Sequence, residues 1–200
     1  MTEVYNAQSQ STVLTPLVSP RDHAEGLVTA AITLVEYGDY HDPRCVAAQP
    51  WIKALQVQMG DRLCLVFRHF PEARRHPHAA EAAEAAGLQG QFWGMHATLL
   101  EHPSALGNGY LVEYAQGLGL DTDRFLRDMA GHACARRVRA DRAGGTLSGV
   151  QGTPTFFVNG DRQPGARETE GAGTSSSASL APPWAREVAD RFRDLSEEPL

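Results

Sequence analysis

Two apolar segments of strand length, residues 31–37 and 63–70, flank a segment with helical periodicity. Both segments are apolar almost throughout, which is typical of strands covered on both faces of a sheet. A strand, a helix and a second strand in this order form a βαβ unit, whose strands run parallel. The sequence therefore predicts an α/β domain with a helix over residues 44–59.

The middle of the chain carries no strand signal. Between residues 77 and 142 the apolar side chains repeat at helical spacing, in segments that begin near residues 78, 92, 110 and 121. The last of them, over residues 121–142, is expected to be a single helix. We therefore predict that an all-helical insertion, over about residues 77–143, interrupts the α/β domain.

A β-hairpin is expected after this insertion. Residues 155–158 are predicted to form a strand, and Asn159-Gly160 is a strong signal for a two-residue hairpin turn. Pro164 cannot donate to a β-ladder, so the returning strand is expected at the sheet edge.

The two ends of the chain differ in composition from the predicted domain, residues 30–165. Residues 1–29 are polar and predict an irregular tail. Residues 166–183 are rich in Gly, Ala and Ser and predict a flexible linker. In residues 184–200 the apolar side chains repeat at helical spacing, which predicts an amphipathic helix.

Charge and cysteine content narrow the classes of function. A net charge of -6 argues against nucleic acid and against an anionic membrane surface as partners. We find no signal-peptide pattern and no apolar segment of membrane-spanning length. Three widely spaced cysteines do not suggest a disulfide framework. We therefore expect a cytoplasmic protein; the sequence contains no signal for its oligomeric state.

The turn between the first predicted strand and its helix is the strongest candidate for chemistry. It contains Asp42-Pro43-Arg44-Cys45 at the expected start of the helix. Unpaired backbone N–H groups and the helix dipole stabilise negative charge at such a position, and they lower the pKa of a cysteine placed there. This turn therefore suits an anion or a reactive thiolate.

Several stretches of the sequence resemble the DsbA-type branch of the thioredoxin superfamily, in which a helical domain interrupts a thioredoxin fold. The matching segments cover most of residues 31–165 and are residues 34–40, 66–71, 76–79, 91–96 and 148–160. The resemblance implies a thioredoxin fold with an inserted all-helical subdomain. It also implies thiol-disulfide exchange on protein substrates, without a cofactor.

The resemblance fails at one decisive position. Family members normally read Cys-Pro-x-Cys after the first strand, whereas this chain has Asp42 where the attacking cysteine is expected and retains only Cys45. Exchange between dithiols needs a second thiol within reach of the first, so that activity is expected to be lost. Asp42 can serve as a helix cap or as part of a binding site. Cys45 can be buried and inert, or it can be a reactive monothiol that forms mixed disulfides with protein thiols or glutathione.

A second candidate site is Thr153-Pro154. The resemblance implies that this peptide bond is cis, that it faces the turn containing Asp42, and that the backbone beside it holds an extended peptide as an added strand. The alternative is a proline that merely begins a strand.

The remaining cysteines and histidines carry weaker signals. Cys64 and Cys134 fall in a predicted strand and a predicted helix, where cysteine usually serves as a small apolar residue. Neither the combination of His41, Asp42 and Cys45 nor the histidines at positions 69, 76 and 78 has the full ligand set of a metal site. We therefore expect no metal and no cofactor.

Three hypotheses for function remain. The first is a DsbA-like oxidoreductase homologue that acts at best as a monothiol through Cys45. The second is a redox-inactive module that binds a peptide or protein in the cleft formed by Asp42, Pro43, Arg44 and Thr153-Pro154. The third is a diverged family member that has lost any function in the cleft. This hypothesis is suggested by the predicted linker that separates the C-terminal helix from the rest of the domain.

Overall fold

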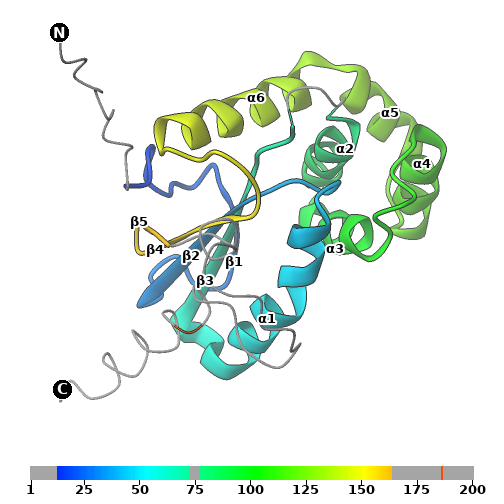
Figure 1. The fold of residues 1–200 in the computed structure, drawn as a ribbon. Coiled ribbons are helices and arrows are strands. Elements are labelled where there is room, and N and C mark those ends of the chain that lie inside the picture. Colours follow the sequence, from blue (N-terminus) through cyan, green and yellow to red (C-terminus); the bar gives the residue numbers. More distant parts are fainter. Residues whose placement is uncertain (1–12, 73–76, 164–185, 187–200) are drawn as a thin grey trace, which may run out of the picture.

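The computed structural model describes residues 13–72, 77–163 and 186 of the chain. Within this part, one mixed sheet has the strand order β1-β3-β2-β4-β5 (Figure 1). Strands β2 and β3 run parallel at its centre, and the other neighbouring pairs are antiparallel. The strands are β1 (His23–Glu25), β2 (Ile32–Gly38), β3 (Leu63–His69), β4 (Thr155–Val158) and β5 (Asp161–Arg162).

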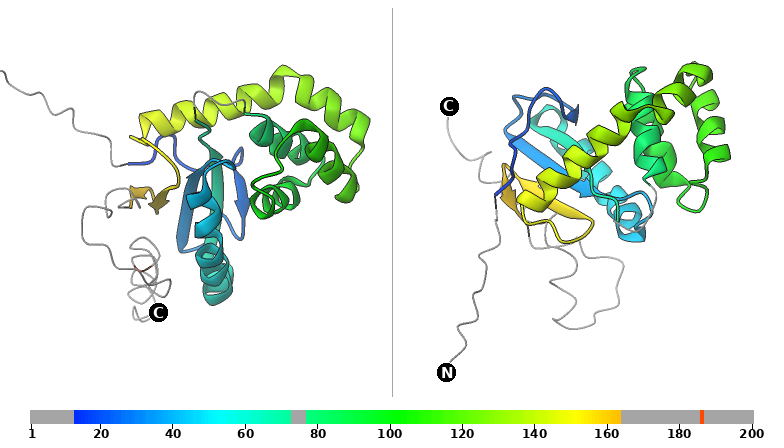
Figure 2. Two further views of the ribbon diagram at one scale, coloured as in Figure 1. Left: turned by 45° about the vertical axis from the view of Figure 1, so that its right-hand side comes forward. Right: turned by 90° about the horizontal axis from the view of Figure 1, so that it is seen from above.

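The helices fall into two groups. Helix α1 connects β2 to β3, which confirms the predicted parallel βαβ unit. The others lie between β3 and β4, and most of them form a subdomain beside the sheet (Figure 2). The helices are α1 (Pro43–Met59), α2 (His78–Gly87), α3 (Phe92–Glu101), α4 (Asn108–Gly117), α5 (Thr122–Ala130) and α6 (His132–Leu147).

The sheet carries an apolar core on each face. On one face, α1 packs through Ala48, Ile52 and Leu55 against side chains of β2, β3 and β4. On the other face, Val35, Tyr37, Val66 and Phe157 lie under α6 and the N-terminal segment, with Leu14 and Val150. A third core fills the helical subdomain, where α2 contributes six buried alanines. The inserted helices are therefore anchored to the sheet by α6 and α2.

The hairpin between β4 and β5 forms as predicted. Asn159 and Gly160 have φ values of 50° and 91°, the left-handed geometry that a two-residue turn of this kind requires. Strand β5 lies at the sheet edge, as expected.

The N-terminal segment differs from its prediction as an irregular tail over residues 1–29. Residues 23–25 form β1, which pairs antiparallel with residues 65–67 of β3. The three residues of this strand show no apolar alternation, so the local sequence does not predict it. Its stabilising contacts come from residues far away in the chain. The His23 ring stacks on Phe92 with centroids 3.5 Å apart, and its Nε2 lies 2.8 Å from Glu84.

The helix predicted over residues 121–142 is instead two helices. Gly131, with φ -78° and ψ 154°, separates α5 from α6. At its other end α6 continues through Gly144 and Gly145 to Leu147, past the predicted limit of the insertion at residue 143. A Cβ at Gly145 would lie 2.7 Å from the Phe70 ring, so glycine at this position lets α6 approach the sheet closely.

The predicted linker over 166–183 and the predicted helix over 184–200 lie outside the described residues, apart from Arg186. In the part of the chain that is described, no helix has both the length and the apolar character needed to cross a membrane.

Candidate functional site

Asp42 caps the N-terminus of α1. Its backbone is extended, and its side chain accepts a hydrogen bond from the Arg44 N–H at 2.9 Å. Pro43 occupies the first helical turn, where its missing N–H costs no helical hydrogen bond. The Asp-Pro-Arg sequence therefore starts the helix through local capping alone.

The Asp42 carboxylate also has two side-chain partners. The Arg44 guanidinium donates to both of its oxygens, at 2.9 and 2.6 Å, and the Thr153 hydroxyl donates at 2.6 Å. Burial by itself raises the pKa of Asp42, but the hydrogen bonds from Arg44 and Thr153 outweigh burial, and the pKa is lowered overall. Asp42 is thus an ionised carboxylate whose charge is balanced within the site.

Cys45 lies behind this turn with none of its surface exposed. Burial raises the pKa of its thiol well above the ordinary value, and the nearby Glu36 carboxylate adds to the effect. The Asp39 N–H points at Sγ from 3.4 Å, which offsets only part of the shift. Cys45 is therefore a protonated thiol at neutral pH.

Glu36, in strand β2, is also buried and is protonated at neutral pH. Burial raises the pKa of Glu36 to about 8, and among the described residues its Oε1 atom has no hydrogen-bond partner. Glu36 therefore raises the pKa of the Cys45 thiol through its charge only above about pH 8, where it is ionised.

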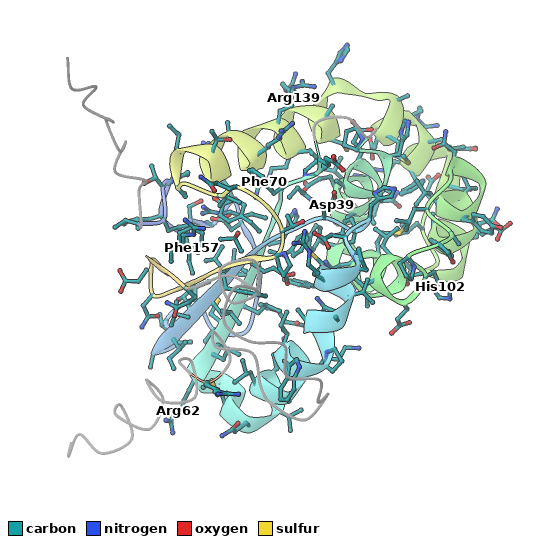
Figure 3. All side chains as sticks on the ribbon, in the orientation of Figure 1. Asp39, Arg62, Phe70, His102, Arg139 and Phe157 are labelled. Atoms are coloured by element: carbon teal, nitrogen blue, oxygen red, sulfur yellow. The ribbon has the colours of Figure 1, made fainter. Side chains whose placement is uncertain are left out.

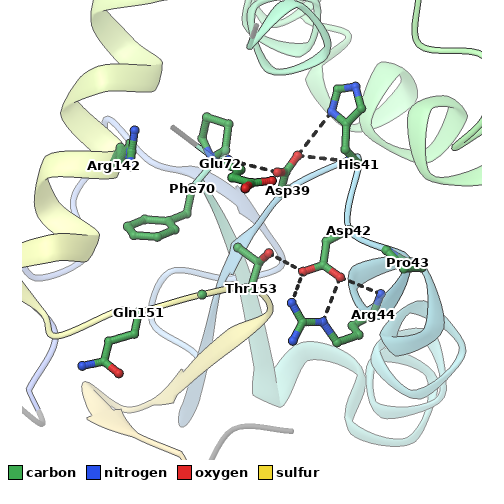
Figure 4. Close-up of a pocket in the computed structure, with 12 residues that line it drawn as sticks. Asp39, His41, Asp42, Pro43, Arg44, Phe70, Glu72, Arg142, Gln151 and Thr153 are labelled. Atoms are coloured by element: carbon green, nitrogen blue, oxygen red, sulfur yellow. Dashed lines mark hydrogen bonds and ion pairs between the residues drawn. The ribbon is translucent and has the colours of Figure 1, made fainter. Parts of the chain in front are cut away.

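A cavity of about 500 Å³ opens in front of Asp42 (Figure 4). The turn before α1 forms one wall, and Phe70 and Arg142 lie on the opposite side. The lining residues are Asp39, His41, Asp42, Pro43, Arg44, Phe70, Pro71, Glu72, Arg142, Gln151, Gly152 and Thr153.

The loop before β4 lines this cavity and contains backbone groups without a hydrogen-bond partner among the described residues. Within the described part of the chain, the N–H groups of Gln151, Gly152 and Thr153 donate no hydrogen bond, and the carbonyls of Gln151 and Thr153 accept none. The Thr153–Pro154 peptide bond that follows is cis. These open donors and acceptors are backbone groups of the kind that an added strand can pair with.

Four of the six site residues proposed from sequence line the cavity: Asp42, Pro43, Arg44 and Thr153. Cys45 and Pro154 do not line it. Sequence reasoning missed Phe70, Glu72, Arg142 and Gln151. Phe70 and Glu72 follow β3, which runs parallel to β2. Because parallel strands end at the same side of a sheet, the predicted topology could have placed these two residues near the turn after β2. Arg142 comes from the inserted subdomain, where periodicity gives no hint of its position.

A separate buried cluster joins the sheet to the helical subdomain. His69, Glu84 and Asp141 offer possible metal-ligating atoms within 4.8 Å of one another. Arg137, however, lies 3.2 Å from Asp141 and 4.0 Å from Glu84, so a guanidinium already supplies positive charge there. The Glu84 Oε1 atom also lies 2.8 Å from His23 Nε2 and 2.9 Å from His69 Nε2. We interpret the cluster as an ion-pair network that holds α2 and α6 to β1 and β3.

Comparisons with known proteins place this geometry in a family. A family model described as thioredoxin matches residues 19–174. Among solved structures, a thioredoxin-like oxidoreductase from Silicibacter pomeroyi has a TM-score of 0.70 at 26% identity, covering 88% of this chain and 94% of that one. The thiol-disulfide exchange protein alpha-DsbA2 from Wolbachia pipientis has a TM-score of 0.69 at 19% identity, covering 87% of each chain.

Two relatives are named as Na(+)/H(+) antiporters, not as thioredoxin-like proteins. A protein named Na(+)/H(+) antiporter NhaA 1 from Salinispora arenicola is 41% identical over 189 residues, which cover 93% of this chain and 29% of that protein. A protein named Na(+)/H(+) antiporter NhaA from Herminiimonas arsenicoxydans is 41% identical over 155 residues, covering 77% of this chain and 25% of that protein. The chain thus spans less than a third of these relatives. By its family match and its architecture, the chain belongs to the thioredoxin family and has the DsbA-like fold, in which a helical subdomain interrupts the sheet.

Proposed function

We propose that this thioredoxin-family domain binds extended polypeptide segments in the cavity between Asp42 and Thr153 without exchanging disulfides with them. In this proposal Asp42 takes the place of an attacking cysteine, and its carboxylate fixes the geometry of the cleft. The observation that carries the proposal is the set of backbone N–H and carbonyl groups at residues 151–153 that the described residues leave unpaired, the Gly152 carbonyl excepted, in the lining of a cavity of about 500 Å³.

The state of the cysteines favours binding over exchange. Disulfide exchange begins with attack by an exposed thiolate, and a low pKa makes that thiolate available. Cys45 has neither property, because its side chain is fully buried and its thiol pKa is raised. Cys64 and Cys134 are also free and buried. A monothiol adduct with glutathione at Cys45 would first require the turn to open.

Binding through the backbone can be tested with peptides. Heptapeptides selected from a random displayed library would be synthesised as acetylated amides, together with analogues N-methylated at alternate residues. We expect methylation in one of the two alternating registers to weaken binding by about tenfold or more, because it removes the N–H donors that face the loop. Equal affinity in both registers would contradict strand-like binding.

A redox assay tests the proposed absence of disulfide exchange. The wild-type protein should not accelerate the reduction of insulin disulfides by dithiothreitol above the rate without protein. Clear acceleration would support thiol exchange at Cys45 in place of simple binding.

A second candidate function is association with a membrane transport protein. The relatives named Na(+)/H(+) antiporter match most of this chain but extend far beyond the matched segment. We propose on this ground that the domain works in association with an antiporter of this kind, which departs from the expectation of no membrane partner. Transport would then reside in the part of the relatives that this chain does not match.

A chimaera tests this association. In the Salinispora arenicola relative, the matched segment would be replaced by this chain or, as a control, by an unrelated thioredoxin-fold domain. We expect Na⁺-dependent proton exchange in membrane vesicles to be retained with this chain and reduced with the control. Equal exchange by both chimaeras would argue against a specific association.

A further inference from the structure

The charged side chains around the cavity are not equivalent, because most of them already have partners. Asp42 is bound by Arg44 and Thr153. The Asp39 carboxylate accepts hydrogen bonds from the backbone N–H groups of His41 and Glu72, at 3.0 and 3.1 Å. Both carboxylates therefore have hydrogen-bond partners within the protein and little capacity left to bind a ligand.

Arg142 is the exception. Its guanidinium lies over the Phe70 ring, 5.7 Å from the centroid, and the described residues give its side chain no hydrogen bond or ion pair. Arg142 is half-buried and lines the cavity on the side opposite Asp42 and Arg44 (Figure 4). A cation that is held in place by an aromatic ring but lacks a counter-ion is well prepared to receive an anionic group.

The position of Arg142 is set by the fold. The glycine at 145 lets α6 lie against Phe70, since a Cβ there would come within 2.7 Å of that ring. The Arg142 side chain, about one turn before the C-terminal end of α6, thus lines the same cavity as residues 151–153. Within the described part of the chain, the three N–H groups of that loop and the carbonyls of Gln151 and Thr153 make no hydrogen bond. A strand bound along that loop would bring its own side chains near Arg142.

We infer that Arg142, seated on Phe70, selects polypeptide segments that carry a carboxylate, so that the preferred ligand of the cleft is an acidic extended segment. This inference rests on the proposed peptide-binding function and adds the class of ligand. The carboxylate belongs to an Asp or Glu side chain or to the C-terminus of the bound segment, and the guanidinium pairs with either through charge-assisted hydrogen bonds.

The test uses nonapeptides selected for binding, in which each position in turn carries Glu, Gln or Lys. The peptides are made as C-terminal amides and as free acids, so that a side-chain carboxylate is distinguished from a terminal one. We expect Glu at one position, or the free terminus, to strengthen binding about fivefold over Gln or the amide at low salt. The Arg142→Gln variant should lose this preference, and Arg142→Glu should favour Lys instead.

Arg139→Gln is the matched control, because Arg139 is exposed on the same helix and does not line the cavity (Figure 3). It should keep the preference for the carboxylate. Thermal unfolding of each variant shows whether the fold is retained, and the reversal by Arg142→Glu cannot arise from unfolding.

The outcomes separate the inference from the function on which it rests. Binding without any preference for a carboxylate, or equal losses in the Arg142 and Arg139 variants, would overturn the inference and leave peptide binding in place. Absence of binding by every peptide would overturn the proposed function and the inference together.

Discussion

The Thr153 hydroxyl donates a 2.6 Å hydrogen bond to the Asp42 carboxylate and so connects the loop before β4 to the N-terminus of α1. Two segments separated by 111 residues are joined at the floor of the cavity. Both partners line the cavity: Asp42 caps helix α1, and Thr153 belongs to the loop before β4.

Thr153→Val removes this hydrogen bond while keeping the β-branched shape. We expect the free energy of unfolding at pH 7 to fall by about 1–2 kcal/mol, because a carboxylate loses a charge-assisted donor. The pKa of Asp42 should rise, since the Thr153 hydrogen bond helps to lower it. Chemical denaturation and carboxylate titration by NMR measure the two effects. Thr153→Ser, which retains the hydroxyl, should keep most of the stability.

Asp42→Cys places a thiol at a helix N-terminus beside Arg44, two features that lower a thiol pKa. We expect this variant to reduce insulin disulfides in the presence of dithiothreitol, with Cys45 available as the second thiol. Asp42→Ser is the control and should remain inactive. A variant that folds but shows no activity would mean that the turn holds residue 42 away from attack.

Cys45 should react slowly with iodoacetamide in the folded protein. Its side chain is fully buried and its thiol pKa is raised, so both access and thiolate fraction are small. We expect alkylation at pH 8 to be at least about 100-fold slower than that of free cysteine, followed site by site by mass spectrometry. Faster labelling of Cys45 than of Cys64 and Cys134 would favour a reactive monothiol.

Glu36→Gln should change how stability depends on pH. The folded protein keeps the Glu36 proton up to about pH 8, whereas the unfolded chain loses it above about 4.5, so rising pH favours unfolding across this interval. We expect the variant to gain stability over wild type between pH 5 and 8 by about 1.4 kcal/mol per pH unit. Urea denaturation at several pH values checks this, and a constant difference would contradict it.

Glu84→Gln should show the opposite dependence. Burial alone raises the pKa of Glu84, but the hydrogen bonds from His23 and His69 outweigh it and lower the pKa to about 2. Its ionised form therefore stabilises the fold above pH 4.5, and this contribution disappears as pH falls towards 2. The variant should be less stable than wild type by about 3 kcal/mol at pH 6, with the difference vanishing near pH 2. Arg124→Gln, at a partly exposed ion pair with Asp128, should have little effect at either pH.

Local patterns in the sequence were enough for most of the elements. The apolar runs at residues 31–37 and 63–70 predicted the parallel central strands, because a strand buried on both faces must be apolar along its whole length. Asn159-Gly160 predicted its hairpin, because few other residues adopt positive φ at both turn positions. The start of α1 followed from Asp42 and Pro43 for the same kind of local reason.

Tertiary structure decided the features whose partners lie far apart in the chain. Strand β1 depends on its pairing with β3, and the close approach of α6 to the sheet depends on the contact between Gly145 and Phe70. The burial of Cys45 and the pairing of Asp42 with Thr153 likewise result from packing between distant segments. A sequence states which side chains are present at a turn and which backbone conformation they favour. Only the folded chain determines that this turn holds a balanced carboxylate over a buried thiol, because charge balance and burial depend on neighbours that the local sequence does not contain.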